Sequence, residues 1–412
     1  MAQSKPNGVD SQRRTWIGLL GIGAAALGIL ILWGTGALQS INNATATSSL
    51  AAASTTLASP VAVAPTPTTS PPTAPPTAPP PTPEPTPPMV PSPLTGLPVS
   101  LEAAVQHPIA VMVDDDFHAR PQSGFNSASI VWHGPAEGGV PRYMMIFQDK
   151  VPTGVGPVRS ARQYFVEWAA EWRAMYVHHG GSPQAIETLI SKGHGQWVYN
   201  ADGFRWLGRY LWRTNDKAAP HNVYTDGAHL RELAARIDAD DGPIKPIWTF
   251  GRGTAWALRP VGSTISVTYP YETITYRYDA STNRYVRYIN SSKTPQIDRD
   301  DGQIVAPVNV VVLRMAFGPL NDGHPKKHRL EANDVGKGQA WISTNGVTIK
   351  GTWRKKSPTA PTLLFGPDGK AITLTAGQTF VQVLPLNYTY RFVPGTASTW
   401  QPPMQVRRLS LF

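Results

Sequence analysis

The stretch IAVMVDDD, residues 109–116, decides the fold of the first half of the chain. Its five leading residues are apolar and three of them are β-branched, which predicts a strand buried on both faces. Three carboxylates, Asp114, Asp115 and Asp116, follow at its carboxyl end. Further strands are predicted at 129–134, 142–149 and 174–181, and helices at 159–174 and 182–193. Strands that alternate with helices predict a layered α/β domain with a mixed sheet, at residues 94–245.

The rest of the chain, residues 246–412, has a different pattern. Short segments between 263 and 385 alternate side-chain type with period two and are rich in Tyr, Thr, Val and Ile. The strings TNG (344–346) and PDG (367–369) are turn sequences, because their glycines supply a positive φ. This pattern predicts an all-β domain, either a sandwich or a partly open barrel.

The composition of the chain is uneven. Of its 412 residues 41 are proline, and 17 of these prolines lie between residues 60 and 98. The absence of cysteine excludes disulfides, thiolate zinc sites and cysteine nucleophiles. Residues 246–412 hold 20 basic and 9 acidic side chains, whereas residues 94–245 hold 14 and 16. The net charge of +10 therefore resides in the second half, where a charged partner is expected.

Residues 16–38 form an uncharged segment rich in Leu, Ile, Ala and Gly. As a helix it would be about 34 Å long, enough to cross a hydrocarbon layer of roughly 30 Å. We expect a transmembrane helix in the lipid bilayer, with a cleaved signal peptide as the alternative. Basic side chains within residues 1–15 place that tail in the cytoplasm and the folded domains outside. Residues 39–93, rich in Ala, Thr and Pro, are expected to form a disordered stalk.

Polar side chains near the ends of the predicted elements are candidates for an active site. Asp114, Glu137, His178 and His221 are the candidate acids and bases. The same four could hold a metal ion, but their spacing matches no established ligand motif, so the sequence assigns no metal and no cofactor. The aspartates could instead pair with arginines in a structural network, because successive strand residues face opposite ways.

An anion site is predicted around Arg159 and Arg162, with Arg120 as a further cation. Both Arg159 and Arg162 fall in the first turn of the predicted helix, beside free backbone amides that favour carboxylate or phosphate. The anion could be internal, such as Glu137 or the aspartates, or it could be a ligand.

Five strings carry a resemblance to a known family: ARPQSG (119–124), EGG (137–139), GPVRSAR (156–162), HHGGSPQA (178–185) and PHNVY (220–224). They resemble the YerB-like proteins, which are bacterial envelope proteins, many of them lipoproteins, without an established activity. The resemblance extends from about Pro93 to Pro385 and implies a two-part ectodomain outside the bacterial plasma membrane. Because this chain has no cysteine to acylate, the helix at 16–38 would be its anchor.

The basic second half is the predicted contact surface for a polymer. Arg284, Arg287, Arg354, Lys355 and Lys356 recur among aromatic residues, a combination that suits an anionic polymer, although a basic surface can also simply be solvated. Outside the cell an anionic envelope polymer is the expected partner and nucleic acid is not. The leading hypothesis is a membrane-anchored binding or scaffold module of unknown biochemical activity. The alternative is an extracytoplasmic hydrolase or transferase with its pocket in the α/β domain.

Overall fold

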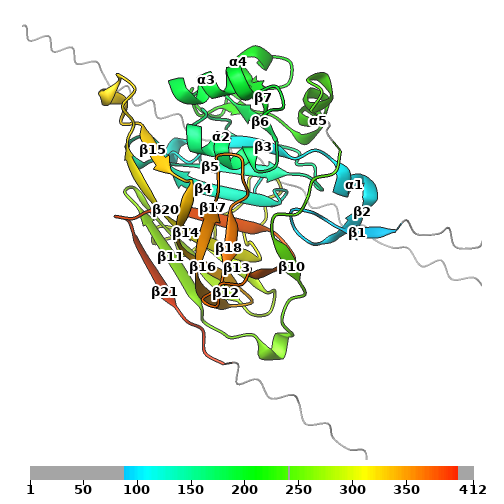
Figure 1. Cartoon of the computed structure of the whole chain (residues 1–412), viewed down its shortest axis with the longest axis vertical. Coiled ribbons are helices and arrows are strands. Elements are labelled where there is room, and N and C mark those ends of the chain that lie inside the picture. The colour runs from blue at the N-terminus through cyan, green and yellow to red at the C-terminus, as the bar shows by residue number, and fades with distance from the viewer. Residues whose placement is uncertain (1–87, 240–241, 398–412) are drawn as a thin grey trace, which may run out of the picture. The chain divides into compact units, whose positions relative to one another are not determined.

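The computed structural model describes residues 88–239 and 242–397 (Figure 1). The predicted cytoplasmic tail, the membrane helix and most of the predicted stalk lie outside these residues. In the part of the chain that is described, no helix is long and apolar enough to cross a membrane. Strand β1 (Met89–Pro91) falls within the range predicted as stalk and pairs antiparallel with β2 (Pro98–Ser100). Regular structure therefore begins before residue 94, the predicted domain boundary.

One mixed sheet runs through both halves of the sequence. Within the described residues its eleven strands are, from edge to edge, β18 (Leu363–Phe365), β17 (Val347–Lys355), β16 (Gly336–Thr344), β14 (Asn309–Pro319), β20 (Thr379–Pro385), β4 (Ile130–Pro135), β5 (Pro141–Phe147), β3 (Ile109–Asp114), β6 (Met175–His178) and β7 (Tyr199–Asp202), with β15 (Leu330–Asn333) paired to β14. A second sheet has the order β13 (Arg284–Ile289), β12 (Glu272–Asp279), β11 (Thr264–Tyr269) and β21 (Thr389–Val393).

Strand β20 joins the two halves of the large sheet. It runs parallel to β14 on one side, where Phe380 pairs with Val310, and parallel to β4 on the other, where Thr379 pairs with Ile130. All seven residues of β20 are buried, as expected for a central strand. The mixed sheet is as predicted, but strands β14 to β18 and β20 of the second half continue it, whereas β11, β12, β13 and β21 form the separate four-stranded sheet.

The remaining elements are short. The helices are α1 (Leu101–Val105), α2 (Gln163–Ala170), α3 (Pro183–Lys192), α4 (Gly203–Trp206) and α5 (Gly227–Arg236), and 3₁₀ turns lie at Phe117–Ala119, Glu137–Gly139, Trp256–Leu258 and Pro325–Lys327. Two further strand pairs are β8 (Trp212–Arg213) with β9 (Val223–Tyr224), and β10 (Thr249–Gly251) with β19 (Thr373–Thr375). With few helices among its described residues, the protein is dominated by its sheets (Figure 1).

Three layers enclose two cores. On one face of the large sheet, Trp132 of β4 stacks on Trp168 of α2 with ring centroids 4.8 Å apart. Helices α2 and α3 bury their apolar sides in this core. On the other face, Val310 of β14 and Phe380 of β20 share a core with Val267 of the four-stranded sheet. The predicted sandwich is thus present, although one of its two sheets includes strands from the first half of the sequence.

Of the two helices predicted in the first half, one has the predicted limits and the other is shorter than predicted. Helix α3 begins at Pro183, after Ser182, and is followed by Gly193, as the sequence predicts. Helix α2 is shorter than the predicted 159–174, because residues 159–162 are extended. The amide of Arg159 donates to the Met112 carbonyl at 2.9 Å, a pairing that a helix would not allow.

Candidate functional site

Residues 155–162 cross the carboxyl end of β3 and connect four separate parts of the sequence. They form isolated bridges that pair Ser123 with Gly156, Val113 with Val158, Val155 with Thr225 and Ala161 with Gly181. The amide of Val158 also donates to the Val223 carbonyl at 2.6 Å. The strings ARPQSG, GPVRSAR, HHGGSPQA and PHNVY are therefore neighbours in space, and the candidate site is built where they meet.

The three aspartates after β3 have different partners. Asp114 contacts His221 and Arg159, Asp115 contacts His133 and Arg120, and Asp116 contacts His118. Asp114 and Asp115 are buried, on opposite faces of the sheet, as expected for successive strand residues. The structure therefore contains the arginine pairing that the sequence left as an alternative, and not one shared carboxylate site.

Asp115 lies in a buried polar network between the large sheet and the four-stranded sheet. Its carboxylate is 2.8 Å from Nε2 of His133 and accepts hydrogen bonds from Arg120 at 3.0 Å and Gln122 at 2.9 Å. Burial would raise the pKa of Asp115, but the hydrogen bond with His133 and the charges of nearby arginines hold that pKa well below its ordinary value. Asp115 is therefore ionised inside the protein.

Glu272, at the start of β12, completes this network from the second half of the chain. It accepts a hydrogen bond from the guanidinium of Arg120 and lies 3.6 Å from His133. Burial raises the pKa of Glu272 to about 9, and the negative charge of Asp115 acts in the same direction. Two carboxyl groups that share one guanidinium thus differ in protonation at neutral pH. Neither Glu272 nor His133 was predicted from the sequence, because their partners come from distant parts of the chain.

Arg287 belongs to the same network and not to a surface. Its guanidinium donates to Tyr143 at 2.8 Å and to Tyr276 at 3.3 Å, and its side chain is fully buried. The prediction that Arg287 contacts a polymer is therefore wrong. In β13 the side chain of Arg287 points inward together with Tyr285 and Ile289, toward the aromatic residues that cover it.

On the opposite face of the sheet, Asp114 orients His221. Its Oδ2 atom is 2.7 Å from Nδ1 of His221 and 2.9 Å from Nε of Arg159. The positive charge of Arg159 is thus paired with an internal carboxylate, Asp114. The sequence left open whether the anion at this position is internal or a ligand.

The other candidate acid–base residues lie elsewhere. Glu137 forms ion pairs with Arg142, at 2.8 Å, and with Arg162. Burial lowers the pKa of Arg162 to about 10. His178 is buried, with its ring nitrogens 2.8 Å from the Gly180 carbonyl and 2.9 Å from Asn200. Of the four candidates, the structure brings only Asp114 and His221 into contact.

A cavity of about 770 Å³ opens beside His221. Its lining residues are His118, Arg120, Pro121, Asp216, Lys217, Ala218, Ala219, His221 and Arg299. Burial lowers the pKa of Lys217 to about 8, and the charge of Arg299 contributes in the same direction. Lys217 donates to the carbonyls of Ala119 and Pro121, at 2.6 and 2.8 Å, and so fixes the wall that carries Arg120. His118 and Lys217 were not predicted as site residues, because neither belongs to a recognisable sequence motif.

Two groups of side chains have the donor atoms and spacing to hold a metal ion. The first is Asp115, His133 and Glu272, and the second is Asp116, His118 and His221. In the first group Arg120 already occupies the space between the carboxylates, so a cation there would compete with a buried guanidinium. The second group borders the cavity and has no such competitor among the described residues.

A separate basic surface lies on strands β16 to β18. The chain from 335 to 367 contains five basic residues and no Asp or Glu. Arg354 and Lys356 are exposed there, and Arg284 is exposed on β13, so the prediction that these three contact a polymer stays open to test. Lys355 is buried and pairs at 2.7 Å with Glu171, the residue that follows α2, so the prediction that it contacts a polymer is wrong. Alternation in β17 turns Lys355 toward the helix layer and Arg354 away from it.

Two family models match the chain. The model described as "Protein of unknown function (DUF3048) N-terminal domain" matches residues 94–240, and the one described as the C-terminal domain matches residues 265–381. "Putative lipoprotein YerB" of Bacillus subtilis (strain 168) is 29% identical over 304 residues, covering 71% of this chain and 86% of the relative. The chain belongs to the YerB-like family. The crystal structure of YerB protein from Bacillus subtilis matches with a TM-score of 0.64 at 26% identity, covering 73% of this chain and 99% of that one.

Membership in the YerB-like family confirms the resemblance carried by the five strings. It also supports the sheet-dominated fold, since the match to the YerB structure extends over most of the described residues. The family is one of unknown function.

Proposed function

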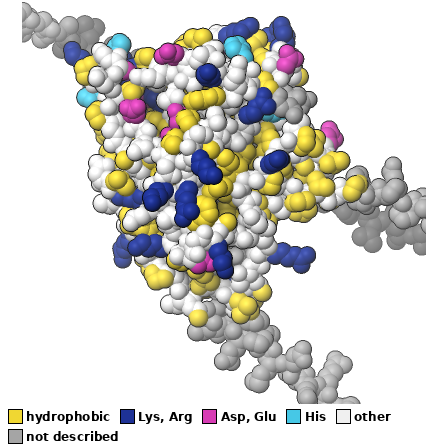
Figure 2. All heavy atoms as spheres, in the orientation of Figure 1, with side chains coloured by type: hydrophobic (Ala, Val, Ile, Leu, Met, Phe, Trp, Pro, Cys, Tyr) yellow, Lys and Arg dark blue, Asp and Glu magenta, His cyan; other side chains and the backbone are white. Residues whose placement is uncertain are grey.

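We propose that this YerB-like protein is a membrane-anchored, extracytoplasmic binding module for an anionic polymer of the cell envelope, and that strands β16 to β18 carry the contact surface. The observation that supports this most directly is the absence of acidic residues from 335–367, where Lys337, Lys350, Arg354 and Lys356 are all exposed. In Figure 2, Lys and Arg side chains gather over these strands among apolar ones, with few acidic side chains between them.

The strands hold these cations in fixed positions. Lys337 of β16 and Arg354 of β17 are register partners and therefore stand side by side. The guanidinium of Arg354 lies 4.3 Å from the ring centroid of Phe365, and this stacking keeps it extended over the sheet. A row of positioned cations beside aromatic rings suits repeated anionic groups along a flexible polymer.

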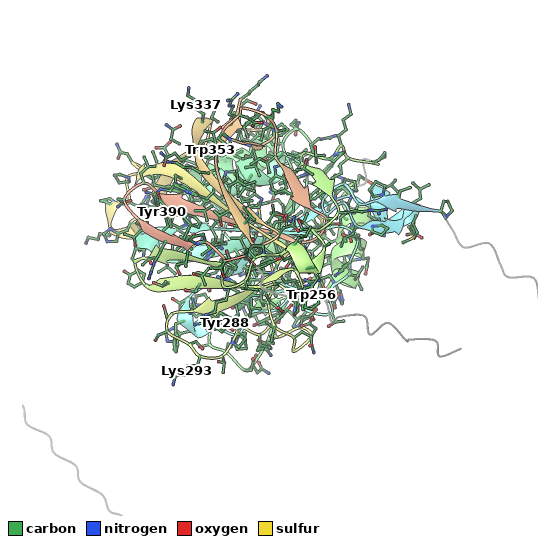
Figure 3. All side chains as sticks on the ribbon, turned by 90° about the horizontal axis from the view of Figure 1, so that it is seen from below. Trp256, Tyr288, Lys293, Lys337, Trp353 and Tyr390 are labelled. Carbon is green, nitrogen blue, oxygen red and sulfur yellow. The ribbon has the colours of Figure 1, made fainter. Side chains whose placement is uncertain are left out.

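Other basic residues of the second half belong to a different surface. Arg277 stacks on Tyr288, with the guanidinium 4.3 Å from the ring centroid, on the four-stranded sheet. Figure 3 shows Tyr288 and Lys293 on one side of the protein and Lys337 on the opposite side. The proposed contact surface is therefore limited to strands β16 to β18.

The relative and the sequence both support the proposed location. YerB is described as a putative lipoprotein, which is consistent with a membrane-associated, extracytoplasmic protein. This chain has no cysteine for a lipid, and its uncharged segment 16–38 would replace that anchor. The alternative of a hydrolase or transferase has less support, because Glu137 and His178 are separated from the contact between Asp114 and His221.

Binding of the purified full-length protein to poly(glycerol phosphate), measured at two salt concentrations, tests the proposal. At about 1 kcal/mol for each cation near an anionic surface, the triple variant K337Q/K350Q/R354Q should bind roughly a hundredfold more weakly. The matched control K293Q/K326Q/K327Q makes the same change in net charge elsewhere and should bind like the wild type. Equal loss in both variants, or binding that salt does not weaken, would refute a specific surface on β16 to β18.

A further inference from the structure

We propose that Asp116, His118 and His221 bind a divalent transition-metal cation, with Zn²⁺ as the fitting probe, at the edge of the 770 Å³ cavity. Oδ1 of Asp116 is 2.8 Å from Nδ1 of His118 and 4.0 Å from Nε2 of His221. In a tetrahedral site with metal–ligand bonds of about 2.0 Å, neighbouring ligand atoms lie about 3.3 Å apart. The two observed distances bracket that value, so small side-chain rotations would complete the site.

The carboxylate of Asp114 provides the second, independent observation. It is 2.7 Å from Nδ1 of His221, which leaves Nε2 of the same ring directed toward Asp116. Metal-binding histidines are commonly held in this way, since a carboxylate on one ring nitrogen fixes the tautomer that presents the other. Asp114 is itself buried and fixed by Arg159 at 2.9 Å. Asp114 is therefore a positioning residue, which holds the ring of His221 in the orientation that a metal ligand requires.

The ligands come from two chain segments. Asp116 and His118 are carried by the 3₁₀ turn after β3, where Asp116 accepts a hydrogen bond from the amide of His118 at 2.9 Å. His221 is carried by the PHNVY segment, which residues 155–162 attach to β3. The sequence offers Asp114, Glu137, His178 and His221 as possible ligands, but their spacing matches no established motif and predicts no metal. The proposed site keeps only His221 of these four and adds Asp116 and His118.

The position of the group also fits an open metal site. His118 and His221 both line the cavity, so a cation held by three protein atoms would direct its remaining position into that space. Arg299 lines the same cavity. An anionic group that bound the metal would thus also meet the guanidinium of Arg299, and carboxylates or phosphates are the class of ligand that this site would take.

The test uses the full-length protein after treatment with a chelator. Titration with Zn²⁺ in a calorimeter should show one equivalent of binding, and Co²⁺ should give the visible absorption bands of a low-coordinate nitrogen and oxygen site. The variants H118A and H221A should each lose this binding. The matched controls H194A and H324A remove exposed histidines elsewhere and should bind as the wild type does.

Two further measurements distinguish a loss of metal binding from a loss of folding. The side chain of His118 is 75% exposed, so H118A should keep the circular dichroism spectrum and the melting temperature of the metal-free wild type. The variant D114N should bind Zn²⁺ about 10- to 100-fold more weakly while retaining one equivalent, as expected for a partner that orients a ligand. The absence of stoichiometric binding in the wild type, or binding that H118A and H221A leave unchanged, would overturn the proposal.

Discussion

Asp115 and Glu272 share the guanidinium of Arg120 in the buried space between the two sheets, and they differ in charge. Asp115 is ionised and Glu272 is protonated at neutral pH, because the pKa of Glu272 is raised to about 9. One carboxyl group comes from each half of the chain. This contact therefore links the stability of the interface between the halves to pH.

The pH dependence of stability should change when Glu272 is replaced by Gln. The folded protein keeps a proton on Glu272 that the unfolded chain releases near the ordinary pKa of 4.5. Between about pH 4.5 and 9, unfolding therefore releases this proton. The contribution of Glu272 to the free energy of unfolding is complete below this pH range and is lost as the pH rises through it. Urea denaturation at pH 5, 7 and 9 should show a steeper decline for the wild type than for E272Q, by up to about 1.4 kcal/mol per pH unit. Equal slopes in the two proteins would contradict the assignment.

The substitution Arg287→Met should lower stability strongly. It removes a buried cation near Asp115 and leaves the hydroxyl groups of Tyr143 and Tyr276 without this donor. Breaking a buried charge network from one side costs about 3–5 kcal/mol. The control Arg284→Met lies on the exposed side of the same strand and should cost less than about 1 kcal/mol. Urea denaturation at pH 7 measures both changes, and similar costs would place Arg287 outside the core network.

Lys355 and Lys356 should respond in opposite ways to replacement by Met. Lys355 pairs with Glu171, and burial already raises the pKa of that carboxyl, so its removal should destabilise the protein by about 3–5 kcal/mol. Lys356 is exposed, and its removal should change stability by about 0.5 kcal/mol or less while it weakens binding of poly(glycerol phosphate). Thermal unfolding and the polymer assay together separate these outcomes. If Lys355→Met weakened polymer binding without loss of stability, the surface prediction from the sequence would be right for this residue.

Local patterns explain the parts of the fold that were predicted well. The apolar run IAVMV predicts β3, and Pro183 with Gly193 marks the limits of α3, because these signals act through neighbouring residues. The predicted helix over 159–174 fails at its start. Residues 159–162 carry no helix breaker, and their extended form depends on hydrogen bonds to distant segments such as that of Arg159 with Met112.

The difference between local sequence signals and contacts with distant segments also applies to the candidate site. Alternation within β13 already indicates that Tyr285, Arg287 and Ile289 share a face, since Tyr and Ile at neighbouring positions favour burial. The basic composition of the second half instead predicted that Arg287 lies on the surface. That prediction was wrong because composition does not show which face of a strand is covered. Asp114 and His221 were both singled out, whereas His118 was not, because only the folded chain places it beside His221.

Local sequence patterns identified strands β3 to β6, helix α3, the resemblance to the YerB-like family and the separation of basic from near-neutral parts of the chain. Long-range pairing was needed to show that β20 inserts between β14 and β4 and makes one sheet of both halves. It also decided that Arg287 is buried and that His118 meets His221. The physical reason is the range of the interactions: periodicity and turn chemistry act within a few residues, whereas strand pairing and the covering of a sheet face join segments that no local pattern connects.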